Sequence, residues 1–241
     1  MTPVQAFAIA LSVVTVAGIV RGFSGFGAGL IMAPALSLLF GPAAAIASIP
    51  LIDLPAVLYF LPEARRHGEW RSVLPLGLAG VCTVPVGAWM LVHLDPEMVR
   101  RGIGFVVLGF VVVLALGWRY RGVVGLPLTL AVGVTSGLLG GAAGIPGPPI
   151  ILFYLSGPAH ARAARASIMG LFVFTSAMGL AAYAFYGLYT ETVLWRTAGL
   201  VPVYLCGVWL GSRLFGRVSE VAFRRVALVV LTSIALAALF T

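Results

Sequence analysis

Two glycine-rich blocks carry the residue types best suited to chemistry in this chain of 241 residues. The first block covers residues 21–29, and the second covers residues 137–149, which include Pro146, Pro148 and Pro149. These prolines lack amide hydrogens and cannot continue a helix from its N-terminal side. Exposed amides at a helix N-terminus bind anions, with help from the helix dipole. The two blocks therefore predict an anion site at the starts of two apolar helices.

We expect both blocks to contribute substrate-binding residues, namely Arg21, Ser24, Gly25, Gly27, Gly29, Pro34, Gly140, Gly141, Gly144, Pro146, Pro148 and Pro149. The alternative role of glycine in a membrane helix is close packing against a neighbouring helix. Symmetric breaks favour the binding role, whereas a single Gly-x-Gly string would not. Small hydroxyl residues nearby, such as Thr175 and Ser176, are expected to pack between helices.

Asp53 is the one acid in the middle of a predicted span. An ionisable group at that depth is costly and suggests a function. Asp53 could pair structurally with Arg21, or it could take up a proton during coupled transport, or it could gate transport by pairing with Arg21. Arg165 is a second candidate for gating, with a plain loop charge as its alternative role. These readings stay open at the level of sequence.

Residues 22–25 also fit Gly-x-Ser-Gly, a nucleophile pattern of intramembrane serine proteases, with Ser24 as the nucleophile. A nucleophilic serine needs a base within hydrogen-bond reach, but no predicted span contains a histidine. The pattern recurs at residues 137–140 with leucine in place of serine, so the glycine spacing is the shared feature. We therefore expect no enzyme. A passive anion channel is a further alternative.

The composition excludes an ordinary water-soluble domain. Hydrophobic residues make up 61% of the chain, and only 9% of its residues are charged, against about 25% in soluble domains. All 15 basic residues are arginine, and they are scattered between apolar runs, which argues against a nucleic-acid partner. No spacing predicts a metal site or an organic cofactor. The class that remains is a polytopic membrane protein in contact with the lipid bilayer.

Glycine, proline and charge clusters separate ten apolar segments, at residues 4–20, 23–40, 42–61, 72–92, 99–117, 123–139, 145–156, 163–187, 196–213 and 222–240. A full span needs about 20 apolar residues. The segment 145–156 is too short, and glycine and proline interrupt 23–40. The sequence therefore predicts an all-α protein with about eight full transmembrane helices and two broken or half-depth helices.

The arginines indicate an orientation. If all ten segments reverse the chain, twelve arginines lie on one side, and the other side holds only Arg100, Arg101 and Arg196. Cytoplasmic loops collect positive charge. This count predicts an inner-membrane protein with both termini in the periplasm.

The two halves of the chain resemble each other, with short matches in the same order at an offset of 115 to 125 residues. Residues 41–42 match 157–158, residues 47–49 match 166–168, and residues 70–71 match 195–196. We divide the chain into a first repeat, 1–118, and a second repeat, 119–241, with five helical elements each. An odd number of elements inverts the second repeat, as in many secondary transporters. The two breaks would then meet between the repeats.

The blocks carry a family resemblance. Residues 25–29 followed by Pro34, and residues 140–144 followed by Pro148 and Pro149, resemble the repeated motif of the TauE/SafE family of sulfite-exporter-like membrane proteins. The resemblance covers nearly the whole chain. It implies transport, by export, of small anions such as sulfite or organosulfonates. Together with the inverted repeats this favours a secondary transporter, and Asp53 suggests the proton as its coupling ion. It does not indicate an oligomeric state.

Overall fold

The structure is a computed structural model that describes residues 2–116, 125–156 and 161–215. Within these residues the chain forms helices and no strands. The helices are α1 (Pro3–Ser24), α2 (Ala28–Phe40), α3 (Pro42–His67), α4 (Trp70–His93), α5 (Pro96–Ala115), α6 (Leu126–Ala143), α7 (Gly147–Ser156), α8 (Ala161–Phe185) and α9 (Glu191–Phe215).

The helix lengths confirm the predicted all-α membrane architecture. Six of the described helices are long and apolar enough to cross a bilayer: α1, α3, α4, α6, α8 and α9. Helix α5 has 20 residues, whereas α2 has 13 and α7 has 10. At 1.5 Å per residue, α2 and α7 are about 20 and 15 Å long, well short of a hydrocarbon core of about 30 Å. They are the two short elements that the sequence predicted. The predicted segment 222–240 lies outside the described residues.

The helix breaks are shorter than we predicted. Residues 21–24 continue α1, and residues 137–143 continue α6, so the predicted unwinding of these stretches is wrong. The chain leaves the helical conformation at residues 25–27 and at residues 144–146. Gly25, Gly27 and Gly144 have φ angles of 81°, 91° and 67°. Such positive φ angles favour glycine, so these three glycines determine where the helices stop.

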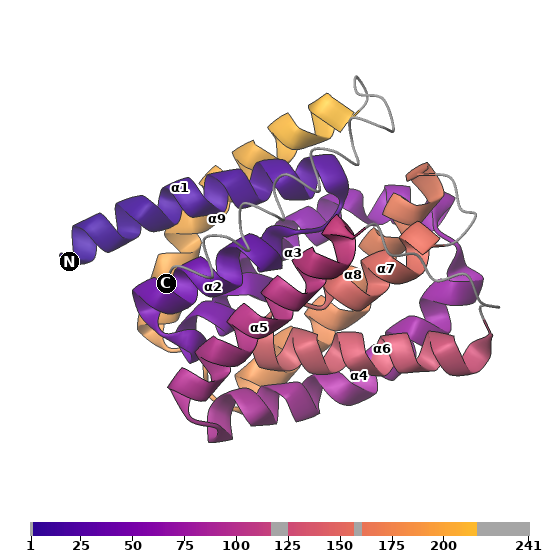
Figure 1. Cartoon of the computed structure of the whole chain (residues 1–241). Coiled ribbons are helices and arrows are strands. Elements are labelled where there is room, and N and C mark those ends of the chain that lie inside the picture. Colours follow the sequence, from indigo (N-terminus) through magenta and orange to yellow (C-terminus); the bar gives the residue numbers. More distant parts are fainter. Residues whose placement is uncertain (1, 117–124, 157–160, 216–241) are drawn as a thin grey trace.

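Two tight helix pairs flank a central pair. Helix α1 packs against α9, and α4 packs against α6. Helices α3 and α8 contact each other and lie between the two pairs (Figure 1). Helix α3 also contacts α9, and α8 also contacts α4, so the central helices join the whole bundle.

Glycines allow the flanking helices to approach at the backbone. A Cβ at Gly87 of α4 would lie 2.3 Å from the carbonyl oxygen of Leu138, and one at Gly141 of α6 would lie 2.1 Å from that of Val84. A Cβ at Gly211 of α9 would lie 2.0 Å from the carbonyl oxygen of Ile19. Lipid gives apolar helices no hydrophobic reason to associate, so close van der Waals contact at small residues drives their packing. For Gly141 the packing role therefore explains the residue.

We predict that Gly87→Ala lowers the thermal unfolding midpoint in detergent, because its methyl group overlaps the α6 backbone and overpacking costs about 1–3 kcal/mol. Gly102→Ala is the matched control, since a Cβ there meets no atom within 4 Å. Alanine is the better helix former by about 1 kcal/mol, so the control is expected to hold or raise the midpoint. A Gly87→Ala midpoint equal to that of the control would contradict backbone contact between α4 and α6.

Candidate functional site

A pocket lies where the two breaks meet. A Cβ at Gly29 would lie 2.3 Å from the carbonyl oxygen of Gly144, so the segments touch, as the sequence predicted. The pocket has a cavity volume of about 50 Å³, whereas about 10–15 Å³ is enough for one water molecule. It therefore suits a small polar group. Its wall includes Arg21, Gly27, Gly29, Asp53, Gly140, Gly144, Pro146, Gly147, Phe172, Thr175, Ser176 and Tyr183.

The pocket lies near the middle of the two central helices. Asp53 lies close to the midpoint of α3, and residues 172–179 lie close to the midpoint of α8. Both helices are long enough to span a bilayer. The pocket is therefore far from both ends of these two helices. Inside a membrane, unwound backbone is tolerated only inside protein or beside a wet cavity.

The two short helices present unequal ends to the pocket. Ala28, Gly29 and Leu30 begin α2 and line the pocket, and the first backbone bond of that helix runs from the Ile31 amide to the Gly27 carbonyl. The α2 start has no side-chain cap, so the pocket faces the helix end that carries unused amides. Helix α7 begins at Gly147 and continues with Pro148 and Pro149, which have no amide hydrogen. The sequence predicted an anion site at the starts of two helices. The structure offers free amides mainly at one of them, the start of α2.

Arg21 and Asp53 form a two-pronged ion pair at the pocket. The Arg21 Nε donates to Asp53 Oδ1 at 2.9 Å, and its Nη2 donates to Asp53 Oδ2 at 3.0 Å. Arg21 is only 1% exposed. The third nitrogen, Nη1, donates to the Gly25 carbonyl of the first break. The pairing that the sequence suggested is confirmed, and it makes this part of the wall formally neutral.

Two aromatic residues complete the surroundings of the pair. The Tyr204 hydroxyl of α9 donates to Asp53 Oδ1. The Arg21 guanidinium lies over the Phe172 ring, 4.4 Å from its centroid. Asp53 thus accepts from α1 and α9, and Arg21 contacts α8. The pair connects helices from both halves of the chain.

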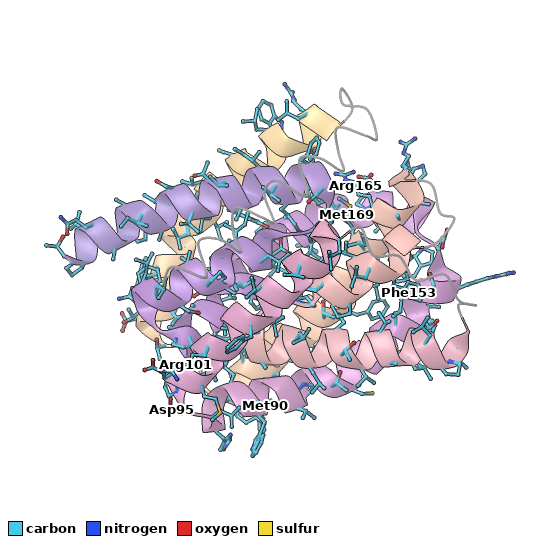
Figure 2. The ribbon with its side chains drawn as sticks, viewed as in Figure 1. Met90, Asp95, Arg101, Phe153, Arg165 and Met169 are labelled. Carbon is cyan, nitrogen blue, oxygen red and sulfur yellow. The ribbon has the colours of Figure 1, made fainter. Side chains whose placement is uncertain are left out.

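Arg165 holds the first break from the other side. It is 4% exposed, and its Nη2 donates to the Gly22 carbonyl at 2.8 Å. Its Nη1 donates to Glu63 Oε1 at 2.6 Å. Figure 2 shows Arg165 and Met169 near the end of α1, and a Cβ at Gly25 would meet both side chains at 2.8 and 3.1 Å. Arg165 is therefore a buried residue that touches α1 and α3, and a solvated loop charge does not describe it.

The remaining predicted residues divide into those on the pocket wall and those behind it. Gly27, Gly29, Gly140, Gly144 and Pro146 line the pocket. The others lie outside the lining, and these are Ser24, Gly25, Pro34, Gly141, Pro148 and Pro149. The Ser24 hydroxyl oxygen lies 2.7 Å from the carbonyl oxygens of both Val20 and Phe26, and its single hydrogen is shared between the two. It stabilises the end of α1.

Sequence reasoning missed the aromatic wall. Phe172 and Tyr183 are ordinary apolar-span residues by type, and nothing in their spacing marks them. Thr175 and Ser176, which we expected to pack between helices, line the pocket instead. A periodicity of four, three and four residues connects Phe172, Ser176, Gly179 and Tyr183 on one face of α8, but that signal is as typical of packing as of binding.

The comparisons with known proteins agree with the sequence motif. A model of the sulfite exporter TauE/SafE family matches residues 10–238. The chain belongs to this family. It is 28% identical over 224 residues to the probable sulfite/organosulfonate exporter TauE of Cupriavidus necator, with 88% of this chain and 85% of that protein covered. No solved structure matches the chain significantly.

Membership of the TauE/SafE family settles the class of protein. The family is described by sulfite export, which is transport, so the protein is a multi-pass membrane transporter and not an enzyme. The protease reading of Ser24 is therefore set aside. The Ser24 hydroxyl is bonded to backbone carbonyls at the end of α1, which gives it a structural task.

We predict that Arg21→Gln lowers the free energy of unfolding by about 3–5 kcal/mol, because it leaves the Asp53 carboxylate buried without its partner. The double variant Arg21→Gln/Asp53→Asn is expected to recover part of that loss. Arg101→Gln is the control, since its pair with Glu97 is exposed and such pairs contribute about 1 kcal/mol or less. The midpoints of thermal unfolding in detergent rank these three variants by stability. Equal midpoints for Arg21→Gln and Arg101→Gln would rule out a stabilising buried pair.

Proposed function

We propose that this transporter exports sulfite or organosulfonate anions through the pocket between the two helix breaks. The observation that carries the proposal is the pocket itself, which meets the uncapped start of α2 at mid-membrane depth beside a guanidinium. The similarity to an exporter named for sulfite and organosulfonate supports the substrate class. The proposed pathway runs across a bacterial inner membrane.

The chemistry of the wall supports a sulfur oxyanion. Sulfite and the sulfonate group each present three oxygen acceptors on one sulfur atom. The amides of Ala28 and Gly29 and the Ser176 hydroxyl are donors of the matching kind, while the Thr175 hydroxyl donates to the Leu171 carbonyl at 3.3 Å. Since about 10–15 Å³ holds one water molecule, a cavity of about 50 Å³ holds a few, which is of the order of such a group.

We propose that residues 1–118 and 119–241 are inverted repeats that rock against each other around the pocket. The helix contacts support this division. The first helix of one repeat packs on the fourth helix of the other in both directions, as α1 on α9 and as α6 on α4. The third helices, α3 and α8, pack on each other at the centre, as the members of a two-fold arrangement would.

We further propose that both termini lie in the periplasm. The arginine distribution supports this orientation through the positive-inside rule. Arg165 belongs to the predicted cytoplasmic set, and Arg101 belongs to the predicted periplasmic set. Figure 2 places them at opposite ends of the molecule. In this orientation the pair between Arg165 and Glu63 lies on the cytoplasmic side of the pocket, where it would gate entry.

Asp53 is the proposed proton site. With Asp53 ionised, its charge cancels that of Arg21, and an arriving anion meets no net positive charge. Protonation of Asp53 leaves the guanidinium unbalanced, and two opposite charges 4 Å apart attract by about 4 kcal/mol at an effective dielectric constant of 20. Proton and anion would then favour each other's binding, so that the two would leave the cell together as cotransport.

We predict saturable uptake of sulfite into liposomes that contain the purified protein, with a rate that responds to an imposed pH gradient. Organosulfonates are expected to compete with sulfite, whereas chloride and acetate are expected to compete weakly. Flux that rises linearly with concentration and ignores the pH gradient would instead indicate a passive channel. Absence of flux for every sulfur anion tested would exclude the proposed substrate class.

We predict that Asp53→Asn abolishes the response of sulfite flux to a pH gradient while it preserves part of the sulfite exchange measured without a gradient. The amide keeps the shape of the carboxyl group but cannot exchange a proton with the solution. Glu97→Gln is the control, because Glu97 is an exposed acid of α5. Equal loss of gradient-driven flux and exchange in Asp53→Asn would point to a structural ion pair.

A further inference from the structure

Tyr183 of α8 holds the end of α6. Its hydroxyl lies 3.0 Å from the Gly140 carbonyl oxygen and 2.9 Å from the Gly141 carbonyl oxygen, so its single hydrogen is shared between the two. The side chain is only 1% exposed. These bonds join α8 to the last turn of α6, just before the second break and next to the pocket.

The carbonyl of Gly141 depends on this hydroxyl. The Gly144 amide donates to Gly140 at 3.0 Å, but the Ile145 amide donates back to Leu139 at 3.2 Å and so does not reach Gly141. The next residue, Pro146, has no amide hydrogen to offer. A buried carbonyl without a donor costs about 1–3 kcal/mol. Tyr183 supplies the donor that the break takes away.

The break that Tyr183 holds is part of the pocket wall. Gly140, Gly144, Pro146 and Gly147 all line the pocket, and so does the Tyr183 ring. The Ser136 hydroxyl also binds this break, at the Pro146 carbonyl 2.7 Å away, but Ser136 belongs to α6 itself. The bonds of the Tyr183 hydroxyl therefore fix the position of this wall relative to α8.

Helix α8 contacts both breaks. Arg165 binds the end of α1 through the Gly22 carbonyl, and Tyr183 binds the end of α6, 18 residues further on. At 1.5 Å per residue this separation is about 27 Å. Thr175 and Ser176 lie between the two contacts and line the pocket. Helix α8 thus forms part of the pocket wall. It also binds the end of α1 on one side of the pocket and the end of α6 on the other.

We propose that Tyr183 is a positioning residue of the anion site: its hydroxyl fixes the α6–α7 break and so sets the affinity and the size selectivity for the sulfur oxyanion. The hydroxyl is committed to backbone carbonyls, so it acts through the wall and not by contact with the anion. This inference rests on the proposed function for its transport readout, and its structural readout is independent of transport.

Tyr189 offers a matched control. Its hydroxyl oxygen is also buried, but it has no hydrogen-bond partner in the part of the chain that the structure describes. Tyr189 lies between α8 and α9 and does not line the pocket. Tyr189→Phe therefore removes the same atom from the same residue type without loosening a helix end.

The first measurement is hydrogen–deuterium exchange in detergent on the peptide that spans residues 140–147. Tyr183→Phe is expected to increase exchange there at least threefold, while exchange in α4 stays unchanged. Tyr189→Phe is expected to leave both regions unchanged. Unchanged exchange at 140–147 in Tyr183→Phe overturns the proposal, whether or not the protein transports sulfite.

The second measurement is flux into liposomes for sulfite and for butanesulfonate, a bulkier sulfonate. Tyr183→Phe is expected to raise the KM for sulfite about fivefold to tenfold, which corresponds to roughly 1–1.4 kcal/mol. The maximal rate should stay within about twofold, and the ratio of the two KM values should change. An unchanged ratio of the two KM values would reduce Tyr183 to a structural residue. An equal loss of maximal rate for both anions, together with a lower unfolding midpoint, would lead to the same conclusion. Failure of the wild type to move either anion would overturn the proposed function, while the exchange experiment still decides the role of Tyr183.

Discussion

The fold depends on one constraint, which is that backbone groups released inside a membrane must find partners within the protein. Helices α1 and α6 stop beside the pocket, and each stop frees carbonyls and amides that need partners within the protein. The freed carbonyls are met by side chains from neighbouring turns and helices, namely Ser24, Arg21 and Arg165 at the first break and Ser136 and Tyr183 at the second. The freed amides at the start of α2 face the pocket. The amides that the helix break leaves without partners are thus available to a polar ligand in the pocket.

The same constraint explains how a chain with so few charges uses those it buries. Arg21 and Arg165 are almost fully buried, and each has a carboxylate partner and a break carbonyl. Such pairs are costly to bury, and their value lies in specifying one arrangement or in switching between two. The second break uses neutral hydroxyls for the same purpose. The two breaks therefore differ in their electrostatics, since among the described residues the side chains that bind the first break include two arginines, whereas hydroxyls bind the second.

Much of the fold could be predicted from the sequence, because membrane spans are set by local properties. Length, apolar composition and the positions of glycine and proline predicted ten segments. Nine of them correspond to helices of the structure, and the tenth lies outside the described residues. The extent of the breaks was the main error. Gly137 and Gly141 have the residue type of a break but serve helix contact, since the backbone of α4 lies against them. A glycine that bends the chain and one that admits a neighbour look alike until the neighbour is known.

The sequence by itself determined the membrane class, the family and the two short elements, since each follows from composition or motif. It offered the pairing of Arg21 with Asp53 as one of several roles, because an isolated charge in lipid is costly, and the structure decided for the pair. Only the tertiary structure decided which groups meet at the pocket. Thr175, Ser176 and Tyr183 are more than 100 residues from the first break along the chain, and Tyr204 reaches Asp53 from another helix. Their roles arise from the way α8 and α9 cross the other helices, and that crossing depends on side-chain and backbone packing that no local pattern encodes.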